Sequence, residues 1–144
     1  MAEELQLEVV TPQRTILNES VGKIILPGIQ GEMGILPEHV PLLTIMDSGI
    51  LSYTLVNDTI SIAVHDGYAQ VDGKSVRVLV ELAEKPEEID LDRAKQAELN
   101  AKKQLDPSSN REVTKDDENI QKYEQKLKRS LTRQRLVQII GSNP

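Results

Sequence analysis

Apolar and polar residues alternate with a period of two through most of the first 84 positions, which is the pattern of short β-strands with one buried face. Leu5, Leu7 and Val9 alternate with polar neighbours, and similar runs cover residues 60–64 and 76–82. Groups of Gly, Pro, Asn, Asp and Ser separate these runs, so the sequence predicts many short antiparallel strands. The expected turns lie at Pro27-Gly28, Asp47-Ser48-Gly49, Asn57-Asp58, Asp66-Gly67 and Asp72-Gly73.

After Pro86 the apolar period lengthens to about 3.6 residues and good helix formers dominate, which predicts two helices. Asp90 is expected to cap a first helix that ends near Leu105. A second helix is expected to reach about Ile140, with capping side chains at Thr114, Asp116 and Asp117. The apolar stripes comprise Leu91, Ala94, Ala97, Ala101 and Leu105 on the first helix, and Ile120, Tyr123, Leu127 and Leu131 on the second.

The predicted fold is therefore mostly β plus α. It consists of an N-terminal antiparallel β-sandwich over residues 1–86 and a C-terminal antiparallel two-helix hairpin over residues 87–144. One stripe of the hairpin is mostly alanine, so little apolar area is available to hold it in place. We expect its docking free energy to be at most a few kcal/mol by area reasoning, which leaves alternative positions accessible.

Composition narrows the chemistry that such a chain performs. The sequence holds three Tyr but no Phe or Trp, so the predicted core is aliphatic, and it holds no Cys and only two His, which argues against disulfides and an ordinary zinc cluster. No apolar run approaches the ~20 residues of a membrane helix, and the start lacks the features of a targeting peptide, so a cytoplasmic chain is expected.

Charge is distributed unevenly along the chain. Residues 1–89 hold 14 acidic and 5 basic residues, a net charge of −9, whereas residues 90–144 hold 9 acidic and 12 basic residues, a net charge of +3. The acidic front half argues against a nucleic-acid surface there, and the basic tail favours phosphate or an acidic protein face.

Residues 31–43 read GEMGILPEHVPLL and form the most specific string in the chain. Two glycines three positions apart permit unusual backbone geometry, and Pro37 and Pro41 hold the chain extended around His39, so a rigid loop is expected. From the residues alone, the alternative for His39 is that it only caps a turn, and the alternative for Glu32 is that it is a solvated turn acid.

This string resembles the G-E-x-G-I-x-P-x-H-x-P-L-L stretch of F-type ATP synthase epsilon subunits, and the order of strands and helices is similar over nearly the whole chain. The resemblance implies a non-catalytic subunit of a proton-transporting rotary complex, which couples ion-driven rotation to ATP synthesis. Its sandwich is expected to bind the gamma subunit and to rest on the membrane c-ring, with Glu32 and His39 nearest the ring. The expected location is peripheral, at the cytoplasmic face of the bacterial plasma membrane.

Residues 89–94 read IDLDRA and resemble the I/L-D-x-x-R-A motif, which in some bacterial members binds ATP as a regulatory ligand. The resemblance implies no required cofactor, and it implies a regulatory ATP site lined by Glu84, Ile89, Asp90, Arg93, Ala94, Arg129 and Arg133. Asn100 stands where ATP-binding relatives have a further arginine, with Lys102 and Lys103 nearby. The alternative is that Asp90 only caps the helix and that Arg93 is solvated.

Four basic residues follow one face of the second predicted helix: Lys122, Lys126, Arg129 and Arg133, here called the basic ridge. A charged stripe is often a solvated face. The resemblance implies instead that this helix extends and sets the ridge against a catalytic beta subunit of the alpha/beta hexamer, which inhibits ATP hydrolysis.

No nucleophile with a base, metal cluster or phosphate-binding fingerprint is found in the sequence, so we predict no catalysis by this chain alone. The alternative function is a free-standing β-sandwich adaptor whose basic helix binds an acidic partner or a membrane surface. The helix lacks Trp and Phe on its apolar face, which weakens the membrane interpretation.

Overall fold

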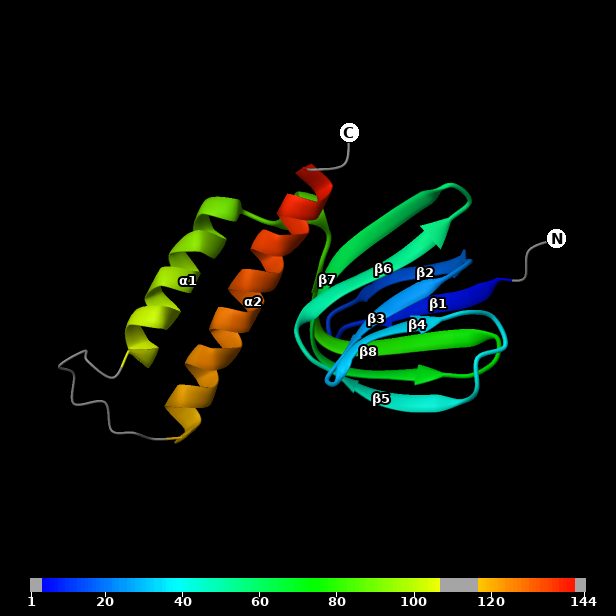
Figure 1. Ribbon diagram of the computed structural model, residues 1–144, viewed down its shortest axis with the longest axis horizontal. Coiled ribbons are helices and arrows are strands. Elements are labelled where there is room, and N and C mark those ends of the chain that lie inside the picture. Colours follow the sequence, from blue (N-terminus) through cyan, green and yellow to red (C-terminus); the bar gives the residue numbers. More distant parts are fainter. Residues whose placement is uncertain (1–3, 107–116, 142–144) are drawn as a thin grey trace. The chain divides into compact units, whose positions relative to one another are not determined.

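The computed structural model describes residues 4–106 and 117–141 (Figure 1). The chain divides into two compact units, Met1–Lys85 and Pro86–Pro144. The first unit contains eight strands: β1 (Leu5–Val10), β2 (Thr15–Val21), β3 (Ile24–Gly28), β4 (Gly31–Ile35), β5 (Leu42–Met46), β6 (Gly49–Leu55), β7 (Asp58–Val71) and β8 (Ser75–Glu84). The second unit contains the short helix η1 (Pro86–Glu88), α1 (Leu91–Leu105) and α2 (Asp117–Gly141).

The strands follow the order β2-β1-β8-β7-β5-β3-β4, and β6 pairs with both β3 and β7. All pairs are antiparallel except β1 with β8, which run parallel. The predicted β-sandwich followed by a helical hairpin is thus confirmed, with one parallel pair that the sequence pattern did not reveal.

The core of the sandwich is aliphatic apart from Tyr53, which is close to what the composition predicted. Leu5, Leu7 and Val9 of β1 are fully buried, because alternate residues of a strand point to the same face. Each such side chain contributes about 1.5–3 kcal/mol through burial. Tyr53 adds an aromatic ring to this core, and burial, followed by the charge of Glu19, raises the pKa of its phenol.

The β7 strand bends in its middle, where the sequence predicted a turn at Asp66-Gly67. That prediction was wrong, because β7 continues through these residues, pairing with β6 before them and with β5 after them. Asp66 has φ 55, in the left-handed region that Asp tolerates better than most residues. The core-facing positions of β7 are even-numbered before this bend, as at Val64, and odd-numbered after it, as at Ala69. The bend therefore lets one strand contribute to the core from both of its halves.

The helical unit begins as predicted, because the Asp90 carboxylate accepts a hydrogen bond from the Arg93 backbone N–H at 3.1 Å. The two helices lie side by side (Figure 1), and the Gln134 Nε2 amide donates to Glu98 across them at 3.5 Å. Ala94 and Ala101 are buried on α1, as the small-residue stripe predicted.

The prediction for the apolar stripe of α2 was partly wrong. Leu131 is 43% exposed, whereas Ser130 and Leu136 are fully buried. Ser130 lies one turn before Gln134, on the face that meets α1, and its hydroxyl donates to the Leu127 carbonyl oxygen at 2.8 Å. Burial of this serine therefore leaves no unsatisfied hydroxyl. The expected caps at Thr114 and Asp116 lie outside the described residues.

No helix within the described parts of the chain is long and apolar enough to cross a membrane.

Candidate functional site

An exposed row of apolar side chains crosses four neighbouring strands of the sandwich. The register pairs Val10 with Leu79, Leu79 with Tyr68, and Tyr68 with Ile45. Cross-strand partners share one face of a sheet, so these four side chains, here called the apolar row, lie together. Ile45 is 63% exposed and Tyr68 47% exposed, while Val10 and Leu79 are half-buried. Leu43, on the same face of β5, is 68% exposed and extends the row. Exposed apolar side chains gathered in this way mark an interaction surface.

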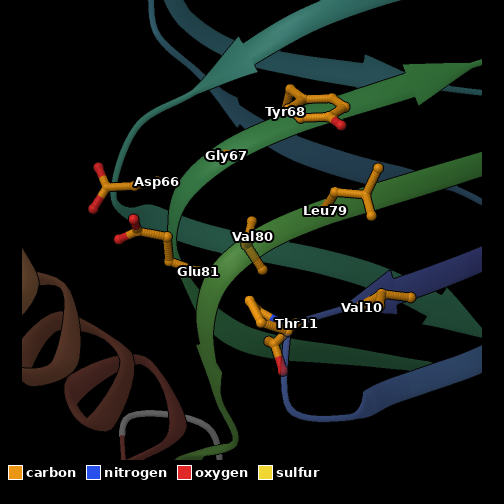
Figure 2. A pocket seen from close by; sticks show the side chains of 9 residues that line it. Val10, Thr11, Asp66, Gly67, Tyr68, Leu79, Val80 and Glu81 are labelled. Carbon is orange, nitrogen blue, oxygen red and sulfur yellow. The ribbon is translucent and has the colours of Figure 1, made fainter.

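A pocket of about 390 Å³ opens beside the apolar row (Figure 2). Tyr68 on β7, Leu79 on β8 and Val10 on β1 form its apolar side. The turn after β1 and the bend of β7 complete it, and the full lining comprises Val10, Thr11, Pro12, Asp66, Gly67, Tyr68, Leu79, Val80 and Glu81.

Asp66 and Glu81 belong to the lining at one end of this pocket, and in Figure 2 their carboxylates point away from Tyr68 and Leu79. The pairs His65 with Leu82 and Gly67 with Val80 put Asp66 opposite Glu81, and Figure 2 shows the two carboxylates near each other. We call this pair the acidic end.

Gly67 sets the shape of the bend beside the acidic end. A Cβ atom at this position would lie 2.0 Å from the Leu79 carbonyl oxygen and 2.7 Å from the Val80 Cα. Since both are backbone atoms, no side-chain rotation makes room. The close approach of β8 to β7 therefore requires glycine here.

The proline-flanked loop places Glu32 and His39 at different ends of β4. Glu32 is exposed beside the β3–β4 turn, and His39 is half-buried in the loop that follows the strand. The His39 Nδ1 lies 2.8 Å from the Val40 carbonyl oxygen, which only accepts, so Nδ1 carries a proton. Leu36 and Val40, on either side of His39, are 56% and 73% exposed. The loop therefore presents an imidazole between two apolar side chains.

Glu84 takes part in a buried network that the sequence did not predict. The fully buried His65 places Nε2 2.9 Å from the Glu84 carboxylate and Nδ1 3.2 Å from the Ser48 hydroxyl. Because a carboxylate accepts, Nε2 of His65 donates to Glu84, and Nδ1 shares a hydrogen bond with the Ser48 hydroxyl. His65 therefore ties the end of β8 to the turn between β5 and β6.

The other residues of the predicted nucleotide site lie in the helical unit, whereas Glu84 belongs to the sandwich unit. Ile89 is half-buried, Asp90 caps α1, Arg93 is exposed and Ala94 is buried. The capping hydrogen bond of Asp90 is compatible both with a nucleotide site and with a plain helix cap. Nucleotide binding therefore stays a prediction.

The contact between Gln134 and Glu98 fixes how the two helices align. In an antiparallel pair it sets Arg93 level with about Ile139, so Arg133 lies about 9 Å and Arg129 about 15 Å further along the axis. A ligand that contacted all three arginines would span roughly three helical turns. Arg93 and Arg133 together span fewer than two turns and form the compact part of the predicted site.

The basic ridge is present on α2 with graded exposure. Lys122 and Lys126 are exposed, whereas Arg129 and Arg133 are half-buried. The Lys126 ammonium lies 5.5 Å from the centre of the Tyr123 ring, a distance that permits a cation–π contact. Lys122 and Lys126 are therefore the members of the basic ridge best placed to meet an acidic surface.

Comparison with known proteins identifies the family. The family model described as "ATP synthase, Delta/Epsilon chain, beta-sandwich domain" matches residues 4–86. The protein named ATP synthase epsilon chain from Citrifermentans bemidjiense is 42% identical over 141 residues, which cover 98% of this chain and 96% of that one. The chain belongs to the ATP synthase epsilon-chain family. The epsilon chain of Carboxydothermus hydrogenoformans is 48% identical over 105 residues, covering 73% of this chain and 78% of its own length. As an epsilon chain, the protein is a non-catalytic subunit of the ATP synthase complex.

Solved structures agree with this fold. A chain in the Euglena gracilis mitochondrial ATP synthase structure of OSCP, F1 and c-ring has a TM-score of 0.76 at 22% identity, covering 90% of this chain and 78% of that one. A chain in the Tetrahymena thermophila central stalk and c-ring structure has a TM-score of 0.54 at 12% identity, covering 92% of this chain and 97% of that one.

Sequence reasoning about this epsilon chain missed the apolar row, the pocket and the His65 network. A signal for the row was present in residues 78–80, where Leu79 interrupts the polar positions between two buried valines. The network gave no such signal, because His65 and Glu84 are 19 residues apart and meet only through the strand register.

Proposed function

We propose that this epsilon chain is the coupling subunit of the central stalk, which transmits ion-driven rotation to ATP synthesis and restrains ATP hydrolysis. The apolar row carries the proposal, because Ile45 and Tyr68 are large apolar side chains held at the surface of a sandwich whose core is already filled. We assign the gamma subunit to this row. Burial of Ile45, Tyr68 and Leu43 against a partner supplies the apolar centre that a stable interface needs.

A binding measurement tests this assignment. Replacement of Ile45 by Lys is expected to weaken binding to an alpha/beta/gamma complex lacking epsilon by about thirtyfold or more, since a charge enters the apolar centre. Val56→Lys is the matched control, because Val56 is fully exposed in the turn between β6 and β7. Equal affinity of wild type and Ile45→Lys would remove the gamma subunit from the apolar row.

The loop after β4 is proposed to contact the rotor ring. Leu36 and Val40 offer apolar area on either side of His39, and Glu32 offers a charge for polar or basic groups of the ring. The Euglena and Tetrahymena assemblies that contain similar folds include a c-ring, which supports this partner. The chain then lies peripherally at the cytoplasmic face of the membrane. Val40→Asp is expected to reduce gradient-driven ATP synthesis while leaving binding to the gamma-containing complex unchanged.

The helical unit is proposed to act as a brake with two positions. Ala94 and Ala101 bury little apolar area, so the compact form of the hairpin is held weakly. The basic ridge offers cations to an acidic segment of a beta subunit. Deletion of residues 90–144 is expected to raise ATP hydrolysis by the assembled complex. Unchanged hydrolysis would exclude the brake. The helix-neutral variant Leu99→Ala, at a 61% exposed position, serves as control.

Regulatory ATP is proposed to bind the compact form through Arg93, Arg133 and the start of α1. An arginine reaches phosphate and a helix start favours anions. At a concentration a hundredfold above its Kd, ATP would favour the compact form by about 2.7 kcal/mol. Asn100 is exposed on α1, and its Oδ1 accepts a hydrogen bond from Gln96 at 3.4 Å. Asn100→Arg is therefore expected to tighten binding in calorimetry, and no heat from wild type at millimolar ATP would reject the site.

A further inference from the structure

Three of the four strands that carry the apolar row are inner strands of the sheet. β7 pairs with β5 and β8, β8 pairs with β7 and β1, and β1 pairs with β8 and β2. A partner strand adds to a sheet along an edge, where backbone groups remain to be paired. A partner that covers the row therefore contacts these three strands through side chains that lie across them.

The spacing of the apolar row matches one face of a helix. Neighbouring strands lie about 4.7–4.9 Å apart, so the row presents one apolar side chain about every 4.8 Å. Residues three or four positions apart on a helix have Cβ atoms about 5–6 Å apart. Alternate residues of an extended strand are about 6.6–6.8 Å apart, which is a poorer match. A helix laid across the strands therefore keeps one apolar side chain over each of them.

A second, mostly polar row lies beside the apolar row on the same face, and we call it the flanking row. The register pairs Glu8 with Arg77, Arg77 with Gln70, and Gln70 with Leu43, each two positions from the apolar row. The Arg77 Nε lies 3.6 Å from the Glu8 carboxylate, so these opposite charges compensate each other. The two rows are about 7 Å apart, within the width of about 10–12 Å that a helix covers. This face therefore suits a helix with an apolar stripe and a polar flank.

We infer that the gamma subunit contacts this face with one amphipathic α-helix that crosses β1, β8, β7 and β5. The inference rests on the proposed function, in which the gamma subunit binds the apolar row. The three steps between these strands measure about 14 Å, which corresponds to about nine to ten residues of helix. The pocket lies on this path beside Val10, Tyr68 and Leu79, and its almost wholly apolar surface suits the apolar stripe of that helix.

Cross-linking from the flanking row tests this geometry. The chain contains no Cys, so Glu8→Cys, Gln70→Cys and Leu43→Cys each provide a single thiol for a short photoreactive diazirine label. Each labelled full chain is bound to the alpha/beta/gamma complex lacking epsilon and irradiated, and mass spectrometry identifies the linked gamma residues. Amide NMR spectra establish that each labelled sandwich is folded. Val56→Cys, in the fully exposed turn between β6 and β7, is the matched control and should give no link to the same gamma segment.

A helix predicts links that follow one another in order along one gamma segment. The links from Glu8→Cys and Leu43→Cys are expected about nine to ten residues apart, with the link from Gln70→Cys about six to seven residues from the first. An extended segment would put the outer links only about four residues apart. That spacing, or links to separate gamma segments, would refute the helix and leave the gamma subunit on the apolar row. If none of the three labels links to the gamma subunit, the proposed interface itself is refuted.

Discussion

Replacement of His65 by Ala is the most informative single perturbation of the sandwich. The imidazole is fully buried, and it joins the Glu84 carboxylate at 2.9 Å to the Ser48 hydroxyl at 3.2 Å. Alanine removes both hydrogen bonds and leaves a cavity the size of the ring. It also leaves Glu84, whose side chain is only 16% exposed, with one partner fewer.

The magnitude follows from these contacts. A hydrogen bond to a charged group contributes about 1.5–3 kcal/mol and a neutral one about 1 kcal/mol, and removal of a large buried side chain costs about 3–5 kcal/mol in all. We therefore expect His65→Ala to lower the free energy of unfolding of the sandwich by about 3–5 kcal/mol. That is a large share of the ~5–15 kcal/mol typical of a domain.

A double-mutant cycle with Glu84→Gln isolates the contact between the two residues. The two substitutions are expected to be non-additive by about 1.5–3 kcal/mol, since each removes the same charge-assisted hydrogen bond. Urea unfolding of the full chain, followed by methyl NMR signals of the sandwich core, supplies all four free energies. His39→Ala is the matched control because His39 lies in a surface loop, and it should change stability by less than about 0.5 kcal/mol.

The reasoning would be refuted by additive effects of His65→Ala and Glu84→Gln, or by a loss of stability below about 1 kcal/mol for His65→Ala. Either result would mean that the network does not fix the end of β8. The expected result would instead make His65 the residue that holds Glu84 in one orientation, whether or not Glu84 contacts a nucleotide.

Three further predictions concern separate parts of the chain. Gly67→Ala is expected to destabilise the sandwich by at least about 3 kcal/mol in urea unfolding, since its Cβ would lie 2.0 Å from a backbone oxygen; a loss under about 1 kcal/mol would contradict this. Ala101→Leu is expected to weaken helix pairing by about 1–3 kcal/mol through overpacking, whereas Leu99→Ala at an exposed position should have little effect, as followed by circular dichroism of the helices. Hydrogen bonds from the Lys74 and Ser75 backbone and the Ser75 hydroxyl lower the pKa of Asp72, so its stabilising contribution is present above its ordinary pKa and is lost as pH falls through the lowered value. Asp72→Asn should remove that acid dependence, and an NMR titration in which the Asp72 carboxyl has an ordinary pKa would contradict the prediction.

The sequence pattern predicted the elements of the fold well, because both periodicities are local. The period of two located the strands, and the change after Pro86 located the helices with the cap at Asp90. The bend at Asp66 was read as a turn because Asp-Gly is also a turn signal, and only pairing on both sides of it shows that the strand continues. The parallel contact between β1 and β8 joins segments about 70 residues apart and leaves no local trace.

The same difference between local signals and long-range strand pairing holds for the candidate functional residues. Asp90 and Arg93 could be proposed because they belong to one short motif, and Glu32 and His39 because they belong to one string. The apolar row takes one residue from each of four strands, so it exists only once the register is known. Leu131 was misplaced on α2 because helical spacing alone does not say which of two adjacent stripes meets α1, and small Ser130 occupies that position.

The bend of β7 connects the stability of the sandwich with its proposed interface. On one side of it His65 is buried and fixes Glu84; on the other side Tyr68 reaches the surface and joins the apolar row. Between them, Asp66 and Gly67 form the bend at which the core-facing positions of β7 change from even to odd numbers. Both residues also line the pocket. A substitution at Gly67 should therefore lower stability and partner affinity together, whereas one at Ile45, which is 63% exposed, should lower affinity alone. This difference separates the residues that build the surface from those that contact the partner.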